Sequence, residues 1–335
     1  MHKLLIKIIA ICLLLAMLVP FASCGNDEES EGGNSGNNSS AYHTITFNTK
    51  GGSTIRSMTV KHGSFATAPA DPVMDNYVFC RWETDKGRAF FFDSYTVNED
   101  LNLEAIWIKA EDLFNLAPMP DSDGIMITKI KHQEDFDVLY VPKIINGKKV
   151  EGIGANAFKG VIDSHASTIV FPDSIRYIGE YAFAGISEVN LLFTGVITHI
   201  EQSSFYNCLT LQSITLGEGI TEIPYCAFYG CVSLRNIAFP EGVTLIDENA
   251  IEEASNLLTV VIPSTVTKID NSAFSDCDAL TAIFFGGSED QFDQIYVALG
   301  NDPLHNTEIY FYSENEPTES GNFWHYDKNN IPEIW

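Results

Sequence analysis

The sequence predicts a mainly β protein in which a solenoid of stacked coils follows a small β module. The main observation is a 23-residue period in the second half of the chain, marked by Ile200, Ile223, Ile246 and Ile269. An aromatic or apolar residue follows each isoleucine by five positions, and an apolar pair such as Ile237 and Phe239 comes later in each unit. Because one such unit cannot bury its apolar side chains alone, a fixed period of this size indicates a stack of coils.

Composition excludes some classes of protein. The chain has 335 residues and a formal net charge of −26, with 45 Asp and Glu against 19 Lys and Arg. This balance argues against a nucleic-acid-binding protein, which needs a basic surface for the phosphates. A hydrophobic content of 45% is sufficient for a sizeable core. The seven cysteines are irregularly spaced, which is not the pattern of a disulfide framework.

Residues 1–23 are typical of an export signal. Their apolar run over residues 8–19 follows two lysines and is too short to span a bilayer. The residues before Cys24 resemble a bacterial lipobox, although Phe21 stands where that motif usually has Leu, Val or Ile. The resemblance implies that Cys24 is lipidated, and the alternative is an ordinary signal peptide cleaved just before it. Residues 24–41 are rich in Gly, Asn and Ser and are predicted to be a flexible linker.

Residues 42–108 are predicted to form a small β module. Residues 42–47 alternate in polarity, residues 50–53 have turn composition, and residues 57–60 and 101–107 are predicted as further strands. The segment resembles the Listeria–Bacteroides repeat (the internalin B-repeat family), and the matching residues are Phe47, Gly51, Gly52, Pro69, Pro72, Tyr77, Phe79, Trp82, Ala105 and Trp107. The resemblance implies a β-grasp fold and a spacer or adhesive role.

The aromatic residues of this module have two possible uses. Tyr77, Trp82 and Trp107 could form a surface on which sugar rings stack. The alternative is that they fill the core of a small domain, which is the more common use of aromatic side chains.

Residues 109–152 are predicted to connect the module to the solenoid and to cap it. Residues 125–130 and 138–141 are predicted to form a hairpin, and the array of coils is predicted to begin near Leu139. The run from Asp121 to Gly124 contains a fragment of a calcium loop, but the downstream glutamate of that motif is missing. A tight turn is the favoured interpretation.

Residues 153–312 are predicted to contain the repeats, and packing explains their pattern. In one unit, Ile237 and Phe239 point to the same side of a short strand, while the residue between them points away. Pro240 ends that strand, because proline has no N–H for a further ladder bond. Phe228 and Leu234 pack inward from the opposite side of the coil.

The repeats resemble the BspA-like leucine-rich repeats of bacterial surface proteins. The matching motifs are Ser204-Phe205-Tyr206-Asn207-Cys208, Ala227-Phe228-Tyr229-Gly230-Cys231 and Ala273-Phe274-Ser275-Asp276-Cys277. The resemblance implies a leucine-rich-repeat solenoid with a parallel sheet on one face and loops or short helical turns on the other. It also implies a role in adhesion. The unit over residues 246–262 departs from the pattern, with Ile251 in place of the aromatic residue and Ala254 in place of the cysteine.

Three cysteines share one column of the repeat. The column contains Cys208, Cys231 and Cys277, and other units place Val, Ile or Ala there. A column that accepts those residues requires a buried apolar group, and free cysteine behaves as one. A disulfide between Cys208 and Cys231 on neighbouring coils is the alternative. No spacing typical of a metal site is present, so neither a metal nor a cofactor is predicted.

The solenoid is predicted to end in a capping segment. Residues 288–300 have the pattern of a helix that begins after Ser288 and ends at Gly300. Residues 309–312 are predicted as a last strand. The aromatic-rich tail, residues 313–335, is predicted to pack against the protein.

The sequence contains no catalytic motif, so an enzyme is not predicted. The candidate binding residues are those that point outward between the buried strand positions. They are Val170, Leu192, Thr215, Ala238, Val261 and Phe284. If the coils stack, these residues form a weakly charged face of the kind on which solenoids bind partners. The alternative is that such residues simply suit a β-sheet. On the binding hypothesis, Val261→Glu with Phe284→Glu abolishes binding and leaves the thermal melt nearly unchanged.

The predicted function is therefore that of a lipid-anchored bacterial surface protein that binds an extracellular protein or glycan through its solenoid. Two other functions remain open. The protein could be an architectural spacer of the cell envelope, or it could be a lipoprotein that captures glycans through the aromatic residues of its β module.

Overall fold

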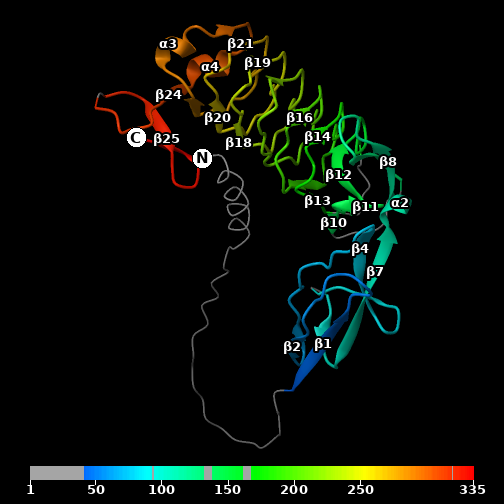
Figure 1. Ribbon diagram of the computed structural model, residues 1–335. Helices are drawn as coiled ribbons and strands as arrows, with labels where there is room; N and C mark the ends of the chain where they lie inside the picture. The colour runs from blue at the N-terminus through cyan, green and yellow to red at the C-terminus, as the bar shows by residue number, and fades with distance from the viewer. Residues whose placement is uncertain (1–40, 93, 132–137, 161–166, 319) are drawn as a thin grey trace, which may run out of the picture. The chain divides into compact units, whose positions relative to one another are not determined.

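The computed structural model describes residues 41–92, 94–131, 138–160, 167–318 and 320–335. The export signal, Cys24 and residues 24–40 of the linker lie outside these residues. The described chain divides into two compact units, of which one contains residues 41–72 and 81–106 and the other Val73–Cys80 and Trp107–Trp335. Strands dominate both units (Figure 1), which confirms the mainly β class. No helix in the described part of the chain is long and apolar enough to span a membrane.

The module contains a five-stranded mixed sheet with the strand order β2-β1-β7-β4-β5. Its strands are β1 (Tyr42–Asn48), β2 (Met58–Lys61), β4 (Tyr77–Thr84), β5 (Ala89–Phe90) and β7 (Leu101–Lys109). A separate antiparallel pair consists of β3 (Ser64–Phe65) and β6 (Thr96–Val97). The predicted strands over residues 42–47, 57–60 and 101–107 are thus confirmed. The first and last of them are neighbours, because β1 and β7 pair in parallel.

Two columns of short parallel strands form the solenoid. The landmark column contains β9 (Ile125–Ile130), β12 (Lys148–Ile153), β14 (Tyr177–Ile178), β16 (His199–Ile200), β17 (Glu222–Ile223), β19 (Leu245–Ile246), β21 (Lys268–Ile269) and β23 (Tyr296–Val297). The second column contains β10 (Val138–Tyr140), β13 (Thr168–Phe171), β15 (Asn190–Phe193), β18 (Asn236–Ala238), β20 (Thr259–Ile262), β22 (Ala282–Phe285) and β24 (Glu308–Tyr312). The two columns follow two sides of the coil stack (Figure 1).

The period of the sequence sets the register between coils. Ile246 pairs with Ile269 in the landmark column, and Val260 pairs with Ile283 in the second column. Both pairs are 23 residues apart, so equivalent residues of successive coils meet across each ladder. The sequence predicts the second column, but it does not predict that the landmark isoleucines also form strands.

A tight turn closes each coil on its third side. The residue before the cysteine column has a positive φ in each coil, for example 52° at Asn207, 66° at Gly230 and 56° at Asp276. Glycine adopts this conformation without strain and Asn and Asp tolerate it, which explains most of the residue types found there. Glu253, with a φ of 61°, is the exception. The backbone ladder continues through this turn, because the N–H of Phe205 donates to the carbonyl of Ala227 at 2.9 Å.

Stacked phenylalanines fill the core between these three sides. The rings of Phe158, Phe183, Phe205 and Phe228 follow one another with centroid separations of 5.5, 5.2 and 5.4 Å. All four side chains are fully buried. Ile251 continues the same column and is also fully buried, so the unit that departs from the sequence pattern keeps its packing.

The predicted hairpin at the start of the solenoid is wrong. β9 pairs antiparallel with β8 (Phe114–Pro118), and β10 pairs with β13 instead of with β9. Residues 121–124 form the turn between β8 and β9, where the N–H of Met119 donates to the carbonyl of Gly124. The predicted tight turn is therefore confirmed. The remaining elements here are α2 (Ala110–Leu113) and β11 (Ile144–Ile145).

The predicted helix over residues 288–300 is also wrong in its extent. The helix α3 (Glu289–Phe292) begins at a capping box of Ser288 and Gln291 and ends after one turn. The chain then enters β23, which pairs in parallel with β21 and adds a further coil. The short α4 (Asp302–Asn306) follows, and β24 confirms the predicted last strand. The spacing of the apolar residues over 288–300 fits a helix. The chain forms a strand there instead, because residues 296–297 pair with the free edge of β21.

The tail extends the second column of strands. β25 (Phe323–Tyr326) pairs in parallel with β24, and β26 (Pro332–Ile334) pairs antiparallel with β25. Trp324 is 1% exposed, and its indole N–H donates to the carbonyl of Phe285 at 2.8 Å. The prediction that the tail packs against the protein is confirmed.

Candidate binding surface

Four of the six predicted outward positions reach the surface. Ala238 is exposed, and Val170, Leu192 and Thr215 are partly exposed. A neighbouring column carries uncharged polar side chains, namely Thr168, Asn190, Ser213, Asn236 and Thr259. We call these nine residues together the uncharged strip. Their repeated placement follows from the register, because Val170 pairs with Leu192 and Asn236 pairs with Thr259.

The last two predicted positions are covered, which corrects the prediction. Val261 and Phe284 are each 7% exposed and form one cluster with Ala282 and Trp324. The centroids of the Phe284 and Trp324 rings are 5.5 Å apart. The tail therefore occupies this end of the sheet face. A charge at either position would be buried, so Val261→Glu with Phe284→Glu tests folding and not binding.

The strip is interrupted at one coil. Residues 213–216 do not continue the ladder of β15, and Leu216 instead forms an isolated parallel bridge with Ile197. The carbonyl of Thr215 accepts the N–H of Ile197 at 2.9 Å. Thr215 is therefore held in place at the surface, although it does not lie in a regular strand.

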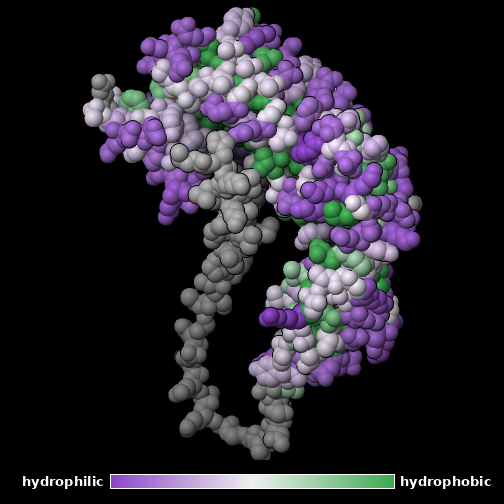
Figure 2. Space-filling view, in the orientation of Figure 1, coloured by the Kyte–Doolittle hydropathy of each residue, from purple (hydrophilic) through white to green (hydrophobic). Residues whose placement is uncertain are grey.

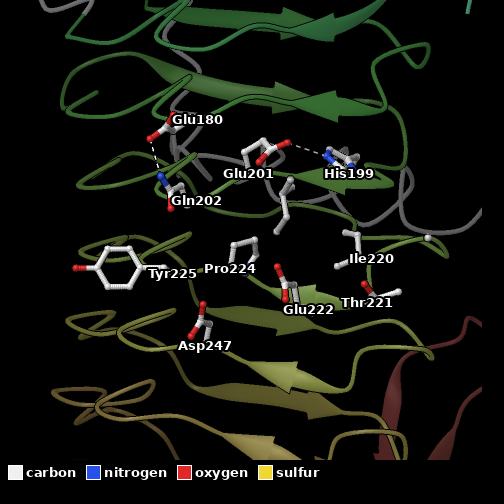
Figure 3. Close-up of a pocket in the computed structure, with 12 residues that line it drawn as sticks. Glu180, His199, Glu201, Gln202, Ile220, Thr221, Glu222, Pro224, Tyr225 and Asp247 are labelled. Atoms are coloured by element: carbon white, nitrogen blue, oxygen red, sulfur yellow. Dashed lines mark hydrogen bonds and ion pairs between the residues drawn. The ribbon is translucent and has the colours of Figure 1, made fainter. Parts of the chain in front are cut away.

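A shallow pocket of about 290 Å³ opens where the landmark column is interrupted (Figure 3). In other coils the residue after the landmark isoleucine donates its N–H to the preceding coil, as Glu201 does to Ile178 at 2.9 Å and Asp247 does to Ile223 at 2.9 Å. Pro224 occupies this position in the coil between them and has no N–H. The two sheets of this column accordingly end at β16 and begin again at β17.

Four carboxylates line the pocket, and two of them, Glu180 and Glu201, have partners in the same lining. Gln202 donates to Glu180 at 2.6 Å, and a ring nitrogen of His199 lies 3.0 Å from Glu201 (Figure 3). Outside the lining, the ring of Tyr177 stacks on His199, and burial, followed by the charge of Glu201, raises the pKa of the Tyr177 hydroxyl. Within the described residues no group of three or more His, Cys, Asp or Glu side chains is arranged to hold a metal ion. The lining of the pocket can hydrogen-bond to polar groups of a ligand, but it does not indicate a particular reaction.

The proposed glycan-stacking residues of the module do not form an open platform. Trp82 is 3% exposed and packs edge-on against Phe47, with ring centroids 5.0 Å apart. Trp107 packs edge-on against Phe79, and Tyr77 is only partly exposed. The structure therefore supports the core alternative for Trp82 and overturns its assignment as a stacking residue.

The cysteine column is buried, as the apolar hypothesis predicts. Cys208 and Cys231 are 0% exposed and Cys277 is 1% exposed, and all three are free thiols. Burial raises the pKa of Cys208 and of Cys277 to about 12. A thiol with so high a pKa is a poor nucleophile, which argues for a packing role.

This burial predicts a loss of stability at alkaline pH. An unfolded thiol deprotonates above about pH 8.5, whereas folded Cys208 keeps its proton up to about pH 12. The unfolded state then binds fewer protons, so the free energy of unfolding falls as pH rises through this window, by about 1.4 kcal/mol per pH unit for each such thiol. Urea denaturation at about pH 8 and about pH 10 should show a smaller fall for Cys208→Ala than for the parent protein. Equal falls would contradict the assignment.

Two features were not predicted from the sequence, and only the second has a signal there. Trp324 covers one end of the face although it lies 40 residues from Phe284 in the chain, and local periodicity carries no information about such a contact. Pro224 opens the pocket, and its signal is present in the sequence. It is a proline at a repeat position where the neighbouring coils use an N–H donor.

The solenoid and the β module each match a different family of known proteins. Residues 136–287 match the BspA type leucine rich repeat region in six copies, and residues 43–106 match the Listeria-Bacteroides repeat domain. No curated protein matches the chain. A leucine rich repeat protein of T. pallidum is similar at 24% identity over 61% of this chain and 86% of that chain, with a TM-score of 0.46. A leucine rich cell surface protein of Faecalibacterium prausnitzii is 30% identical over 54% of this chain and 40% of that chain, with a TM-score of 0.35.

Proposed function

Because this chain carries six BspA-type leucine-rich repeats and a Listeria–Bacteroides repeat domain, we propose that it is exported to the bacterial surface and binds an extracellular partner through the uncharged strip. The observation that supports this proposal is the distribution of charge. Residues 167–262 contain eleven Asp and Glu and two Lys and Arg, yet none of them stands on the strip. Hydrophilic residues dominate the visible surface in Figure 2.

The proposed role of the strip follows from solenoid geometry. Stacked coils present equivalent side chains at regular intervals, which gives an extended face suited to a partner that contacts several coils. The strip spans the coils from β13 to β20. Uncharged side chains lose less solvation free energy than carboxylates when a partner covers them, and the partner must still offer hydrogen bonds to their hydroxyl and amide groups.

Leu192→Glu with Ala238→Glu is expected to weaken partner binding at least about tenfold, because it places two carboxylates on the contact surface. Binding is measured on an array of immobilised extracellular-matrix proteins and polysaccharides. Both positions are at least partly exposed, so the thermal melt should change little. The matched control is Thr221→Glu with Thr244→Glu, two exposed positions beside the landmark column. Equal binding by both double variants would remove the strip from consideration.

We also propose that Cys24, which lies outside the described residues, anchors the protein through a lipid. Cells expressing the protein are expected to incorporate labelled palmitate into the chain, and Cys24→Ala is expected to abolish the label. Label that persists in Cys24→Ala would exclude this anchor. Cys12→Ala provides a matched control, because Cys12 lies within the apolar part of the export signal.

A further inference from the structure

We infer that the partner of the uncharged strip is a neutral, unbranched polysaccharide that lies along the coil stack. This inference rests on the proposed function and adds the chemical class of the ligand. Three features support it. They are the absence of charge on the strip, the repetition of one neutral hydrogen-bonding side chain in every coil, and aromatic side chains at both ends.

Charge complementarity favours a neutral ligand. The chain has a formal net charge of −26, so an anionic polysaccharide or an acidic protein would be repelled at the distances where association begins. A cationic partner would be drawn to carboxylates outside the strip, for example Glu222 in the landmark column and Glu201 directly after β16. A surface that lacks charge on so acidic a protein suits a ligand that also lacks charge.

The neutral polar column matches a ligand that repeats. Each coil from β13 to β20 contributes one hydroxyl or amide side chain to it. Strands of one ladder are about 4.7–4.9 Å apart, so Thr168 and Asn190 recur at this interval in the first sheet, as Asn236 and Thr259 do in the second. Ser213 stands between the two sheets, outside either ladder. Asn236 and Thr259 are bonded to each other, because the side-chain oxygen of Asn236 accepts the Thr259 hydroxyl at 2.7 Å. The side-chain N–H groups of Asn236, which is exposed, can still donate to a ligand. A polysaccharide offers the same hydroxyls at every unit, whereas the surface of a folded protein does not repeat.

Aromatic rings stand at the two ends of the strip. Tyr140 is partly exposed and pairs with Val170, which places it next to the first coil. At the other end, Tyr326 is 39% exposed, and its ring centroid lies 4.8 Å from that of Trp324. Ala238 pairs with Val261, and Val261 belongs to the same cluster as Trp324. Tyr326, which packs on Trp324, therefore lies toward this end of the strip. Its ring offers a flat apolar face suited to a sugar ring.

The composition of the strip disfavours a protein partner. Cores of protein interfaces are enriched in aromatic residues, Met and Arg, which supply most of the binding energy. The nine residues of the strip include none of these. Small hydroxyl and amide side chains provide many weak hydrogen bonds instead, and such bonds give useful affinity only when a long ligand makes many of them together.

The test is calorimetric titration of the full chain with neutral oligosaccharides of glucan, mannan, xylan and galactan type, from dimers to octamers. For at least one series, affinity should rise with chain length and then level off as the strip is filled. Tyr326→Ala should weaken binding about fivefold or more, and Tyr326→Phe should retain it, because stacking requires the ring and not the hydroxyl. Leu192→Glu with Ala238→Glu should abolish binding, and Thr221→Glu with Thr244→Glu should not.

Two results would overturn the inference in distinguishable ways. If no neutral series binds, but an arrayed protein binds and Leu192→Glu with Ala238→Glu abolishes that binding, the ligand class is wrong and the proposed function stands. If an oligosaccharide binds equally well to the double variant and to its control, the strip is not the site and both proposals fail. Binding to no member of the neutral panel is sufficient to reject a neutral polysaccharide.

Discussion

Phe205→Ala is expected to lower the free energy of unfolding by about 3–5 kcal/mol, one of the two largest effects of any single substitution considered for this protein. The side chain is fully buried, and its ring stacks between Phe183 at 5.2 Å and Phe228 at 5.4 Å. Removing it leaves a cavity in the middle of the column and also removes two ring contacts. Because each coil is stabilised mainly by its neighbours, the loss falls on three successive coils.

Urea denaturation followed by circular dichroism measures this effect. Phe228→Ile is the informative comparison, because the same column holds Ile251, fully buried, one coil further on. It should cost clearly less than Phe205→Ala, since an apolar side chain still fills most of the space. Tyr225→Ala, at a position that is 41% exposed, should cost little. A loss below about 1 kcal/mol for Phe205→Ala would show that the column does not carry the stability assigned to it.

Trp324→Ala is expected to have the second largest effect. It should lower the free energy of unfolding of the tail and the last coils by about 3–5 kcal/mol. The side chain is 1% exposed, contacts Phe284, and donates its indole N–H to the carbonyl of Phe285. Without it, Val261 and Phe284 would face water. The cost should be local, because a solenoid transmits stability only between adjacent coils.

Hydrogen exchange resolves this locality. Amides of β22 and β24 should exchange faster in Trp324→Ala, and those of β13 and β15 should not change. Trp335→Ala is the matched control, because Trp335 is 43% exposed and its indole N–H also donates to a backbone carbonyl, that of Ser313. Uniform acceleration along the whole solenoid would contradict a nearest-neighbour account of its stability.

Periodicity predicted most of the solenoid, because every coil repeats the same packing requirement. The step of 23 residues from Val260 to Ile283 predicted a register that the ladder of the second column confirms. Likewise, the presence of Ile251 and Ala254 in the aromatic and cysteine columns showed that those columns are apolar and buried. Periodicity failed where a segment chose a partner outside its own unit. β9 pairs with β8 and not with β10, and residues 296–297 extend a sheet instead of continuing a helix.

The candidate binding surface was also predicted only in part, because alternation along a strand is a local pattern. Alternation along a strand gave the outward positions correctly, and Leu192 and Ala238 are at the surface. It could not show that a tail residue covers Val261 and Phe284, since that contact depends on where a non-repeating segment folds back. The aromatic residues of the module were ambiguous because spacing alone does not separate a buried Trp82 from an exposed one.

The most direct test of the proposed role of the strip is hydroxyl-radical footprinting of the protein with and without a saturating partner identified on the array. If the strip binds the partner, Leu192 and Tyr326, both accessible in the free protein, should lose labelling in the complex. Tyr225, which is 41% exposed beside the landmark column, and Tyr296, which is 63% exposed within it, should keep theirs. Protection of Tyr225 and Tyr296 with unchanged labelling of Leu192 would contradict the account.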